Sequence, residues 1–408
     1  MSNIVIQCFE HERWPVPEEH MGHFESLVSF NDRNGNRFFD VGNRCIKFRH
    51  YVGVIQVGNL TLEILPKLDR ESGDKTKMRD HLISMLHRTG ILPLEDVGPA
   101  SLHTIHGSLF DLYLELFLRR VRQIVHAGIP KRYSLVQGNE RFLRGHLLMN
   151  RHIMRNMFDK SKFFEEYQHF SKDNLLNQIL KRALAIVALM PVKAARDARN
   201  LLTFFEDVEN REVNPQDFGR VNYTRNTECC RTAVNMAEII ITNHQPDLRK
   251  GAMAITSLLF DMNRLFELYV SREIVRRRSA GIQVKLQHRQ VFWSNDDAGN
   301  GKTIRPDIIV AKDGKTFVLD TKWKLFDGKA PSDADLKQLY AYSLQLKANR
   351  VILIYPSPGQ DFMSSSGFFS ESDGIHDMRP VSVWRVPLLS QNGLNNDLGR
   401  DILCRLTT

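Results

Sequence analysis

The segment IRPDIIVAKDGKTFVLDTKW, residues 304–323, decides the fold of the C-terminal part of the chain. Two β-type runs flank Asp313-Gly314, a strong signal for a two-residue type I′ hairpin turn. With that loop, Asp307 lies directly opposite Asp320 on the neighbouring strand. Opposed side chains have Cβ atoms about 4.5–5.5 Å apart, and like charges there destabilise a sheet. The predicted hairpin therefore needs a positively charged group or ion that compensates the repulsion between its two carboxylates.

A divalent cation is one such compensation. Mg²⁺ takes oxygen ligands, typically one or two carboxylates, with water and substrate phosphate completing the shell. Lys322 follows Asp320 by two residues and therefore points to the same face of the strand. Carboxylates beside its ammonium would keep it charged, so we expect it to orient water and to stabilise charge on a reacting phosphate. The alternative is a hairpin with exposed charges, because a D-x-K pattern alone is common in a chain that is 25% charged.

Two predicted helices flank the hairpin. Upstream, FDMNRLFELYVSREI places Glu267 at the edge of an apolar stripe, where its carboxylate could reach the hairpin. Downstream, DLKQLYAYSLQL places Gln338 and Tyr342 on one helix face, four residues apart. The alternatives are an ordinary surface glutamate and a polar rim on a packing helix.

The order helix-Glu, Pro-Asp, D-x-K and helix-Q-x-x-x-Y resembles the PD-(D/E)xK nuclease superfamily, in its RecB-like branch. The resemblance implies that Glu267, Asp307, Asp320 and Lys322 form a metal-dependent catalytic core. It also implies that Asp307, Asp320 and the main-chain carbonyl of Thr321 bind Mg²⁺, with Glu267 as a further candidate ligand. Gln338 and Tyr342 would help to hold the site and the DNA. Nucleases of this superfamily hydrolyse phosphodiester bonds with Mg²⁺.

The remainder of the chain also shows regular patterns. The first part is β-rich up to residue 65, with a hairpin turn at Gly58-Asn59, and a polar stretch at residues 243–250 marks the best domain boundary. A Ser/Gly-rich loop is expected at residues 364–367. The helices are expected at about residues 75–88, 110–127, 174–190 and 222–243, and a last strand at 380–386.

Several segments outside the hairpin resemble the McrC family, the nuclease subunits of McrBC modification-dependent restriction systems. They are VGNLTLEILPKL, KMRDHLISMLHRTG, AGIPKRY, LRGHL and FSKDNLLNQILKRAL, and the resemblance runs from about residue 52 to residue 353. It implies an McrB-like AAA+ GTPase ring as partner, double-stranded DNA containing methylcytosine as substrate, and stimulation of GTP hydrolysis. This chain has no G-x-x-x-x-G-K-[ST] phosphate loop, so we expect it to bind no nucleotide itself.

The charge of the 408-residue chain is uneven: 56 Lys+Arg against 47 Asp+Glu give +9, and residues 101–200 alone sum to +9. This basic block would insert into the partner ring or contact the DNA backbone. Arg141 and Arg144 are the candidate partner-contacting residues, with a plain structural role as the alternative. The five cysteines lack metal-ligand spacing, and we find no signal peptide and no membrane-length apolar run, which predicts a reduced, cytoplasmic protein without membrane contact.

The predicted fold is an α+β N-terminal region followed by an α/β nuclease domain of restriction-endonuclease-like type. We expect a β-rich domain at residues 1–105, a basic, mainly helical region for ring docking at 106–250 and the nuclease domain at 251–408. The leading functional hypothesis is a Mg²⁺-dependent DNA endonuclease subunit that works with an AAA+ GTPase. Its rivals are a stand-alone RecB-like nuclease and a non-cleaving activator of the GTPase.

Overall fold

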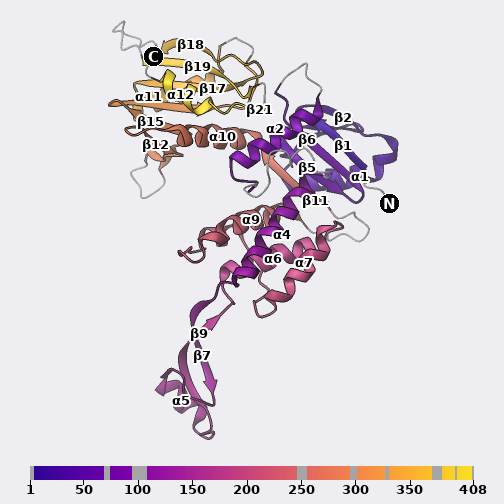
Figure 1. The fold of residues 1–408 in the computed structure, drawn as a ribbon, viewed down its shortest axis with the longest axis vertical. Helices are drawn as coiled ribbons and strands as arrows, with labels where there is room; N and C mark the ends of the chain where they lie inside the picture. Colours follow the sequence, from indigo (N-terminus) through magenta and orange to yellow (C-terminus); the bar gives the residue numbers. More distant parts are fainter. Residues whose placement is uncertain are drawn as a thin grey trace. The chain divides into compact units, whose positions relative to one another are not determined.

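The computed structural model describes residues 4–68, 74–93, 108–245, 255–294, 301–326, 330–369, 379–390 and 393–406. The chain divides into two compact units, both drawn in Figure 1. Unit 1 combines residues 1–105 with residues 259–408, and unit 2 consists of residues 106–258. The two outer regions of the sequence, expected as separate domains, thus share one unit. Most of the expected linker, residues 246–250, lies outside the described residues.

The N-terminal half of unit 1 is built on β1 (Ile4–Phe9), β6 (Leu60–Leu65) and β5 (Tyr51–Val57). β1 runs parallel to β6, and β5 pairs antiparallel with β6 across the two-residue Gly58-Asn59 loop, which confirms the predicted hairpin. Every residue of β6 is buried, so this sheet forms a core. The other elements of this half are β2 (Arg13–Pro15), the 3-10 helix η1 (Glu18–His20), α1 (Met21–Arg33), β3 (Phe39–Gly42) and β4 (Cys45–Phe48).

The C-terminal half of unit 1 contains a six-stranded sheet. In spatial order its strands are β12 (Gln283–Leu286), β15 (Ile308–Lys312), β16 (Lys315–Thr321), β17 (Arg350–Ser357), β19 (Arg379–Pro387) and β18 (Met363–Phe369). β16, β17 and β19 run parallel, and the outer strands are antiparallel to their neighbours. α11 (Asp333–Gln345) lies between β16 and β17 in sequence and packs Leu339 and Tyr342 into the core of this sheet.

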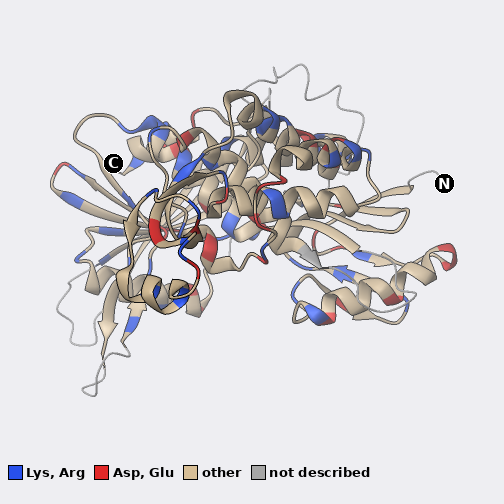
Figure 2. Cartoon of the chain, turned by 90° about the horizontal axis from the view of Figure 1, so that it is seen from below, with Lys and Arg blue, Asp and Glu red and all other residues tan. Residues whose placement is uncertain are grey.

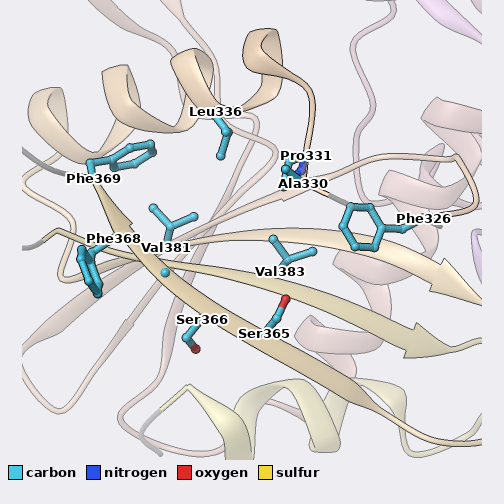
Figure 3. A pocket seen from close by; sticks show the side chains of 11 residues that line it. Phe326, Ala330, Pro331, Leu336, Ser365, Ser366, Phe368, Phe369, Val381 and Val383 are labelled. Carbon is cyan, nitrogen blue, oxygen red and sulfur yellow. The ribbon is translucent and has the colours of Figure 1, made fainter. Parts of the chain in front are cut away.

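One expectation for this sheet is wrong. Residues 364–367 were expected to form a Ser/Gly-rich loop, but they lie inside β18 and pair with β19 over its whole length. Small polar residues give no local strand signal, and here the neighbouring strand provides the hydrogen bonds that hold them extended. An apolar cavity of about 370 Å³ lies between this edge and α11, lined mainly by Phe326, Leu336, Phe369 and Val383 (Figure 3). None of its lining residues is charged, so it offers no acid–base chemistry.

Helices join the two halves of unit 1. They are α2 (Lys75–Arg88), at the predicted bounds, α10 (Met262–Arg277) and α12 (Leu398–Arg405). Arg88 at the end of α2 forms an ion pair with buried Glu273 of α10, with N and O atoms 3.4 Å apart. A Cβ atom at Gly399 of α12 would lie 2.0 Å from the carbonyl oxygen of Glu273, so only glycine allows this close helix packing. Two short pairs complete the unit: β13 (Gln290–Trp293) with β14 (Lys302–Ile304), and β20 (Leu389–Ser390) with β21 (Gly393–Leu394).

Unit 2 has a helical part and an arm. The helical part contains α4 (Leu109–Ala127), α6 (Leu175–Leu189), α7 (Ala194–Leu202), η2 (Thr203–Phe205), α8 (Pro215–Gly219), η3 (Glu228–Cys230) and α9 (Arg231–Asn243), with β10 (His244–Gln245) and β11 (Ile255–Asp261), the last of which crosses the unit boundary in sequence. α9 begins later than predicted, because Thr224 and Thr227 form a hydrogen-bonded turn before it. No helix among the described segments combines the length and apolarity of a membrane span.

The arm is formed by β7 (Arg132–Glu140), β8 (His146–Leu147), α5 (Met149–Asn156) and β9 (Phe163–Ser171). β9 pairs with both other strands, and Figure 1 shows this hairpin leaving the helical part of its own unit. Residues 106–250 were expected to be mainly helical; the structure has long helices in α4, α6, α7 and α9 of this range, whereas the arm is largely β structure. Figure 2, which colours the cartoon of the chain by residue type, shows Lys and Arg positions interspersed with Asp and Glu positions.

Candidate active site

The hairpin of β15 and β16 has the register that the sequence predicted. Ile308 pairs with Leu319, and the loop consists of Asp313-Gly314, whose φ angles of 52° and 72° are the left-handed values of a type I′ turn. Asp307 immediately precedes β15, so this register places it across from Asp320 at the open end of the hairpin.

Asp307 is held by the strand opposite it. Its Oδ2 accepts hydrogen bonds from the backbone N–H and from the hydroxyl of Thr321, each 2.8 Å long. Burial raises the pKa of Asp307, and the two Thr321 donors together with Lys322 partly offset that rise. Thr321 thus fixes one Asp307 oxygen and leaves the other to meet a ligand. The Thr321 carbonyl, expected to bind a metal, remains a prediction.

Asp320 is the most buried carboxylate of the hairpin, with 2% of its surface exposed. Burial, and then repulsion from Asp307, raise the pKa of Asp320 to about 6. Its Oδ1 accepts a 3.3 Å hydrogen bond from Gln338 Nε2. Its Oδ2 lies 2.8 Å from Lys322 Nζ but has no well-aligned hydrogen-bond donor among the described residues. Asp320 therefore presents a buried oxygen whose bonding capacity is incompletely used.

Lys322 is an ammonium among oxygen atoms. Its Nζ donates to Gln338 Oε1 at 3.1 Å and lies 3.8 Å from Asp335 Oδ1, in addition to the contact with Asp320. Burial alone would lower the pKa of Lys322, but the carboxylates of Asp320, Asp335 and Asp307 outweigh it, so the pKa is raised. The side chain is therefore charged at neutral pH, in agreement with the expectation from the sequence.

Glu267 reaches the same site from α10. Its carboxylate accepts a hydrogen bond from Gln287 Nε2. Burial, and then the charge of Asp307, raise the pKa of Glu267 to about 7. The charges of Asp307 and Asp320 both act on Glu267, so it lies within electrostatic range of the hairpin carboxylates, with a proton affinity matched to neutral pH.

Gln338 and Tyr342 connect the hairpin to α11. Gln338 contacts Lys322 and Asp320, and its Nε2 lies 2.6 Å from the Tyr342 hydroxyl. That hydroxyl in turn donates to the Arg305 carbonyl at 3.2 Å. The predicted pair therefore forms one hydrogen-bonded chain from Lys322 to the segment between β14 and β15 that contains Asp307.

Two contributors were missed from the sequence. Asp335, one helical turn before Gln338, accepts a 2.6 Å bond from Lys324 and faces Lys322; the three-residue spacing from Gln338 was its available signal. Glu10, at the end of β1, accepts a 2.8 Å bond from the Trp323 indole beside Lys322. No local pattern could have found that contact, because 313 residues separate its partners.

Glu10 is a buried acid with few partners. It is 1% exposed, its Oε1 also accepts from the Lys67 backbone at 2.9 Å, and its Oε2 lies 3.8 Å from His11 without a hydrogen bond. Burial raises the pKa of Glu10 to about 7, against the opposing effect of the two donors. The Trp323 ring also packs on Phe266, with centroids 5.5 Å apart. The N-terminal sheet thus supports the residues that follow β16.

The donors at the hairpin fit a hard cation in chemistry. Asp307 and Asp320 supply the one or two carboxylates that Mg²⁺ usually takes, and the underused Asp320 Oδ2 is a suitable ligand atom. Within the described residues, no group of three or more His, Cys, Asp or Glu side chains is arranged to hold a metal ion. A metal site at the hairpin would therefore use the two carboxylates of Asp307 and Asp320, without Glu267 as a direct ligand in this conformation.

Arg141 and Arg144 lie in unit 2, in the loop that joins β7 to β8, and both are exposed. Buried Glu165 of β9 fixes this loop, because its Oε2 accepts from the backbone N–H groups of Arg144 and Gly145 at 2.6 and 2.7 Å. The Arg144 backbone is thus held, and its guanidinium carbon lies 6.0 Å from the centroid of the Tyr167 ring.

These observations define a class: mixed α/β proteins in which a β-hairpin presents two carboxylates and a lysine beside a Gln/Tyr helix. The chain belongs to the McrBC 5-methylcytosine restriction system component family, which its sequence matches over residues 46–356. It is 21% identical over 291 residues to the Type IV methyl-directed restriction enzyme EcoKMcrBC of Escherichia coli strain K12, a match that covers 64% of this chain and 81% of that protein.

Solved structures show the same fold. The chain is similar to a chain of the Thermococcus gammatolerans assembly of McrB AAA+ hexamers with bound McrC, with a TM-score of 0.64, 21% identity, and coverage of 99% of this chain and 100% of that one. A cryo-EM structure of the Thermococcus gammatolerans McrBC complex matches with a TM-score of 0.50, 23% identity, and coverage of 67% and 88%. The predicted resemblance to McrC is confirmed.

Proposed function

We propose that this chain is the Mg²⁺-dependent endonuclease subunit of a McrBC-like restriction complex, and that it cleaves methylcytosine-containing double-stranded DNA together with an AAA+ GTPase. The observation that carries the proposal is the connected cluster of Asp307, Asp320, Lys322 and Gln338. Family membership, and the McrB hexamers bound to the similar McrC chain, support the AAA+ partner.

The chemistry follows from what each side chain can do. Asp307 and Asp320 would hold the cation, which when bound supplies an activated water and neutralises developing charge on the phosphate. Lys322 remains charged, so it donates hydrogen bonds to the attacking water or to a phosphate oxygen and does not remove a proton. Gln338 fixes the direction of the ammonium, and Tyr342 fixes Gln338. Glu267, whose pKa is about 7, is able to take up a proton at neutral pH.

The arm of unit 2 is proposed to contact the partner ring. It presents Arg141 and Arg144 on a loop whose backbone is fixed by Glu165. A cation placed in this way can stabilise charge near bound nucleotide, which would stimulate GTP hydrolysis by the partner.

The test combines cleavage and GTPase assays. Methylated or unmethylated plasmid is mixed with the chain and Mg²⁺, with and without the AAA+ partner and GTP. Asp307→Asn and Lys322→Ala should abolish cutting, while Asp313→Asn in the hairpin turn and Lys315→Ala on the same hairpin, both exposed positions, serve as matched controls. Cleavage that needs partner, GTP and methylation supports the proposal. Cleavage by the chain alone supports a stand-alone nuclease, and GTPase stimulation without any cutting supports a non-cleaving activator.

A further inference from the structure

The ribbon formed by β13 and β14 stands outside the six-stranded sheet and exposes large apolar side chains. Gln290 pairs with Ile304 and Trp293 with Lys302, with a bulge at Phe292 between them. Three consecutive side chains of β13 are largely solvent-exposed: Val291 is 58%, Phe292 47% and Trp293 50% exposed. An exposed apolar cluster of this kind usually marks an interaction surface.

The base of the ribbon is anchored firmly. Ile304 is buried in the core that also contains Leu339 and Tyr342 of α11. Gln290 Nε2 donates to the Gln345 carbonyl at the end of α11, 3.2 Å away. A Cβ atom at Gly301 would lie 3.1 Å from the Trp293 carbonyl oxygen, so glycine lets the two strands approach closely. The aromatic side chains are therefore carried on a fixed support.

The ribbon leads directly into the carboxylate site. β14 ends at Ile304, and Asp307 follows three residues later. The chain from Lys302 to Asp307 spans at most about 17 Å, which corresponds to about five base steps of a duplex. Arg305, two residues before Asp307, is tied to the site because its backbone carbonyl accepts a 3.2 Å hydrogen bond from the Tyr342 hydroxyl. A phosphodiester at Asp307 thus brings neighbouring nucleotides within reach of the ribbon.

The charge of the ribbon indicates which ligand it takes. Arg289, Lys302 and Arg305 are exposed, and no described residue of the segments 287–294 and 301–306 is acidic. Asp296 and Asp297 lie in the sequence between the strands, outside the described residues. Cations that flank exposed aromatic side chains match DNA, because phosphates take the cations and bases stack on the rings.

We propose that the β13–β14 ribbon is a DNA-contacting wedge, in which Phe292 and Trp293 pack against the bases beside the cleaved phosphate while Arg289 and Lys302 contact the backbone. Apolar wedges of this type partly unstack a base step and bend the duplex, which allows more protein surface to contact DNA. The inference deepens the proposed function, since it rests on a DNA phosphate at Asp307.

Tryptophan fluorescence provides a direct test. The chain has four tryptophans, and Trp14, Trp323 and Trp384 are at most 8% exposed, so quenching by DNA reports mainly on Trp293. The full chain is titrated in EDTA with an unlabelled and a dye-labelled duplex, so that binding is measured without cleavage. We expect quenching in the wild type and about tenfold weaker binding for Trp293→Ala, as expected for the loss of one stacked base. Trp293→Phe should retain most of the affinity.

Matched controls separate the wedge from general effects. Phe368→Ala removes an exposed aromatic side chain from β18, at the far edge of the sheet, and should leave DNA affinity unchanged. Lys302→Ala should reduce the salt dependence of binding, whereas Lys315→Ala should not. Equal affinity for Trp293→Ala and wild type overturns the proposal, as does a Trp293→Ala loss confined to binding of the AAA+ partner. Because the titration in EDTA contains no free metal ion, it measures DNA binding through Trp293 independently of whether the chain cuts DNA.

Discussion

Glu10 makes a quantitative prediction about stability and pH. The carboxyl is 1% exposed, and its pKa is raised from 4.5 to about 7 by burial. The folded chain therefore holds a proton between these two values that the unfolded chain has released. The contribution of Glu10 to stability is complete below pH 4.5 and is lost progressively as the pH rises to about 7, because the ionised form then has to be buried. The difference corresponds to on the order of 3 kcal/mol between the two limits.

Glu10→Gln removes this titration while it preserves an oxygen that accepts from Trp323 and Lys67. Between pH 5 and pH 8 the wild type should lose about 2–3 kcal/mol more unfolding free energy than the variant. Other groups whose pKa is raised, such as Glu267, titrate in both proteins and cancel in this comparison. Glu25→Gln, at an exposed position of α1, should behave like the wild type.

Urea unfolding followed by tryptophan fluorescence measures this effect in the correct part of the chain. All four tryptophans, at positions 14, 293, 323 and 384, belong to unit 1, so the signal is insensitive to unit 2. If wild type and Glu10→Gln lose the same free energy between pH 5 and pH 8, Glu10 is not the buried acid described here, and the reasoning fails.

Three further predictions concern the hairpin and the arm. Mg²⁺ should raise the melting temperature of the wild type but not that of Asp320→Asn. The increase in the wild type should be larger at pH 8 than at pH 5.5, because protons compete with the cation for a carboxyl whose pKa is about 6. A thermal shift series measures this, and an equal shift in the variant would exclude Asp320 as a ligand. Gln338→Ala should slow cleavage roughly 10–100-fold because it releases Lys322, and Tyr342→Phe should slow cleavage less. Neither variant should change the stimulation of GTP hydrolysis. A normal single-turnover cleavage rate for Gln338→Ala would contradict the positioning role. The Arg141→Ala/Arg144→Ala double variant should no longer stimulate GTP hydrolysis by the partner, while it keeps the Mg²⁺-induced thermal shift. Full stimulation by this variant would show that the loop between β7 and β8 does not contact the ring.

The hairpin was predictable because its determinants are local. Asp313-Gly314 fixes a two-residue loop, and the loop length alone sets which residues face each other, so the position of Asp307 relative to Asp320 followed from counting. The helical spacing of Gln338 and Tyr342 is local in the same sense. The bounds of α2 were predicted for the same reason.

The errors have a non-local origin. β18 consists of small and polar residues whose extended form depends on pairing with β19, which no window of sequence reveals. The strands of the arm lie in a basic stretch without a regular pattern, and β7 pairs with β9 although α5 and two loops separate them in the sequence. The contact between Glu10 and Trp323 joins the two sequence segments of unit 1, and it could only be seen once unit 1 was assembled.

The discontinuity of unit 1 has a consequence for synthesis of the chain. Unit 2 is continuous in sequence and is complete as soon as residue 258 has left the ribosome, whereas the first 105 residues must wait for the segments that follow. At about 5–20 residues per second, translation of the intervening segment takes on the order of 10–30 s. Glu267, the hairpin and α11 all emerge after it. A chain interrupted before residue 259 thus carries the arm but none of the hairpin carboxylates, so any hydrolytic activity arises only when synthesis is nearly finished.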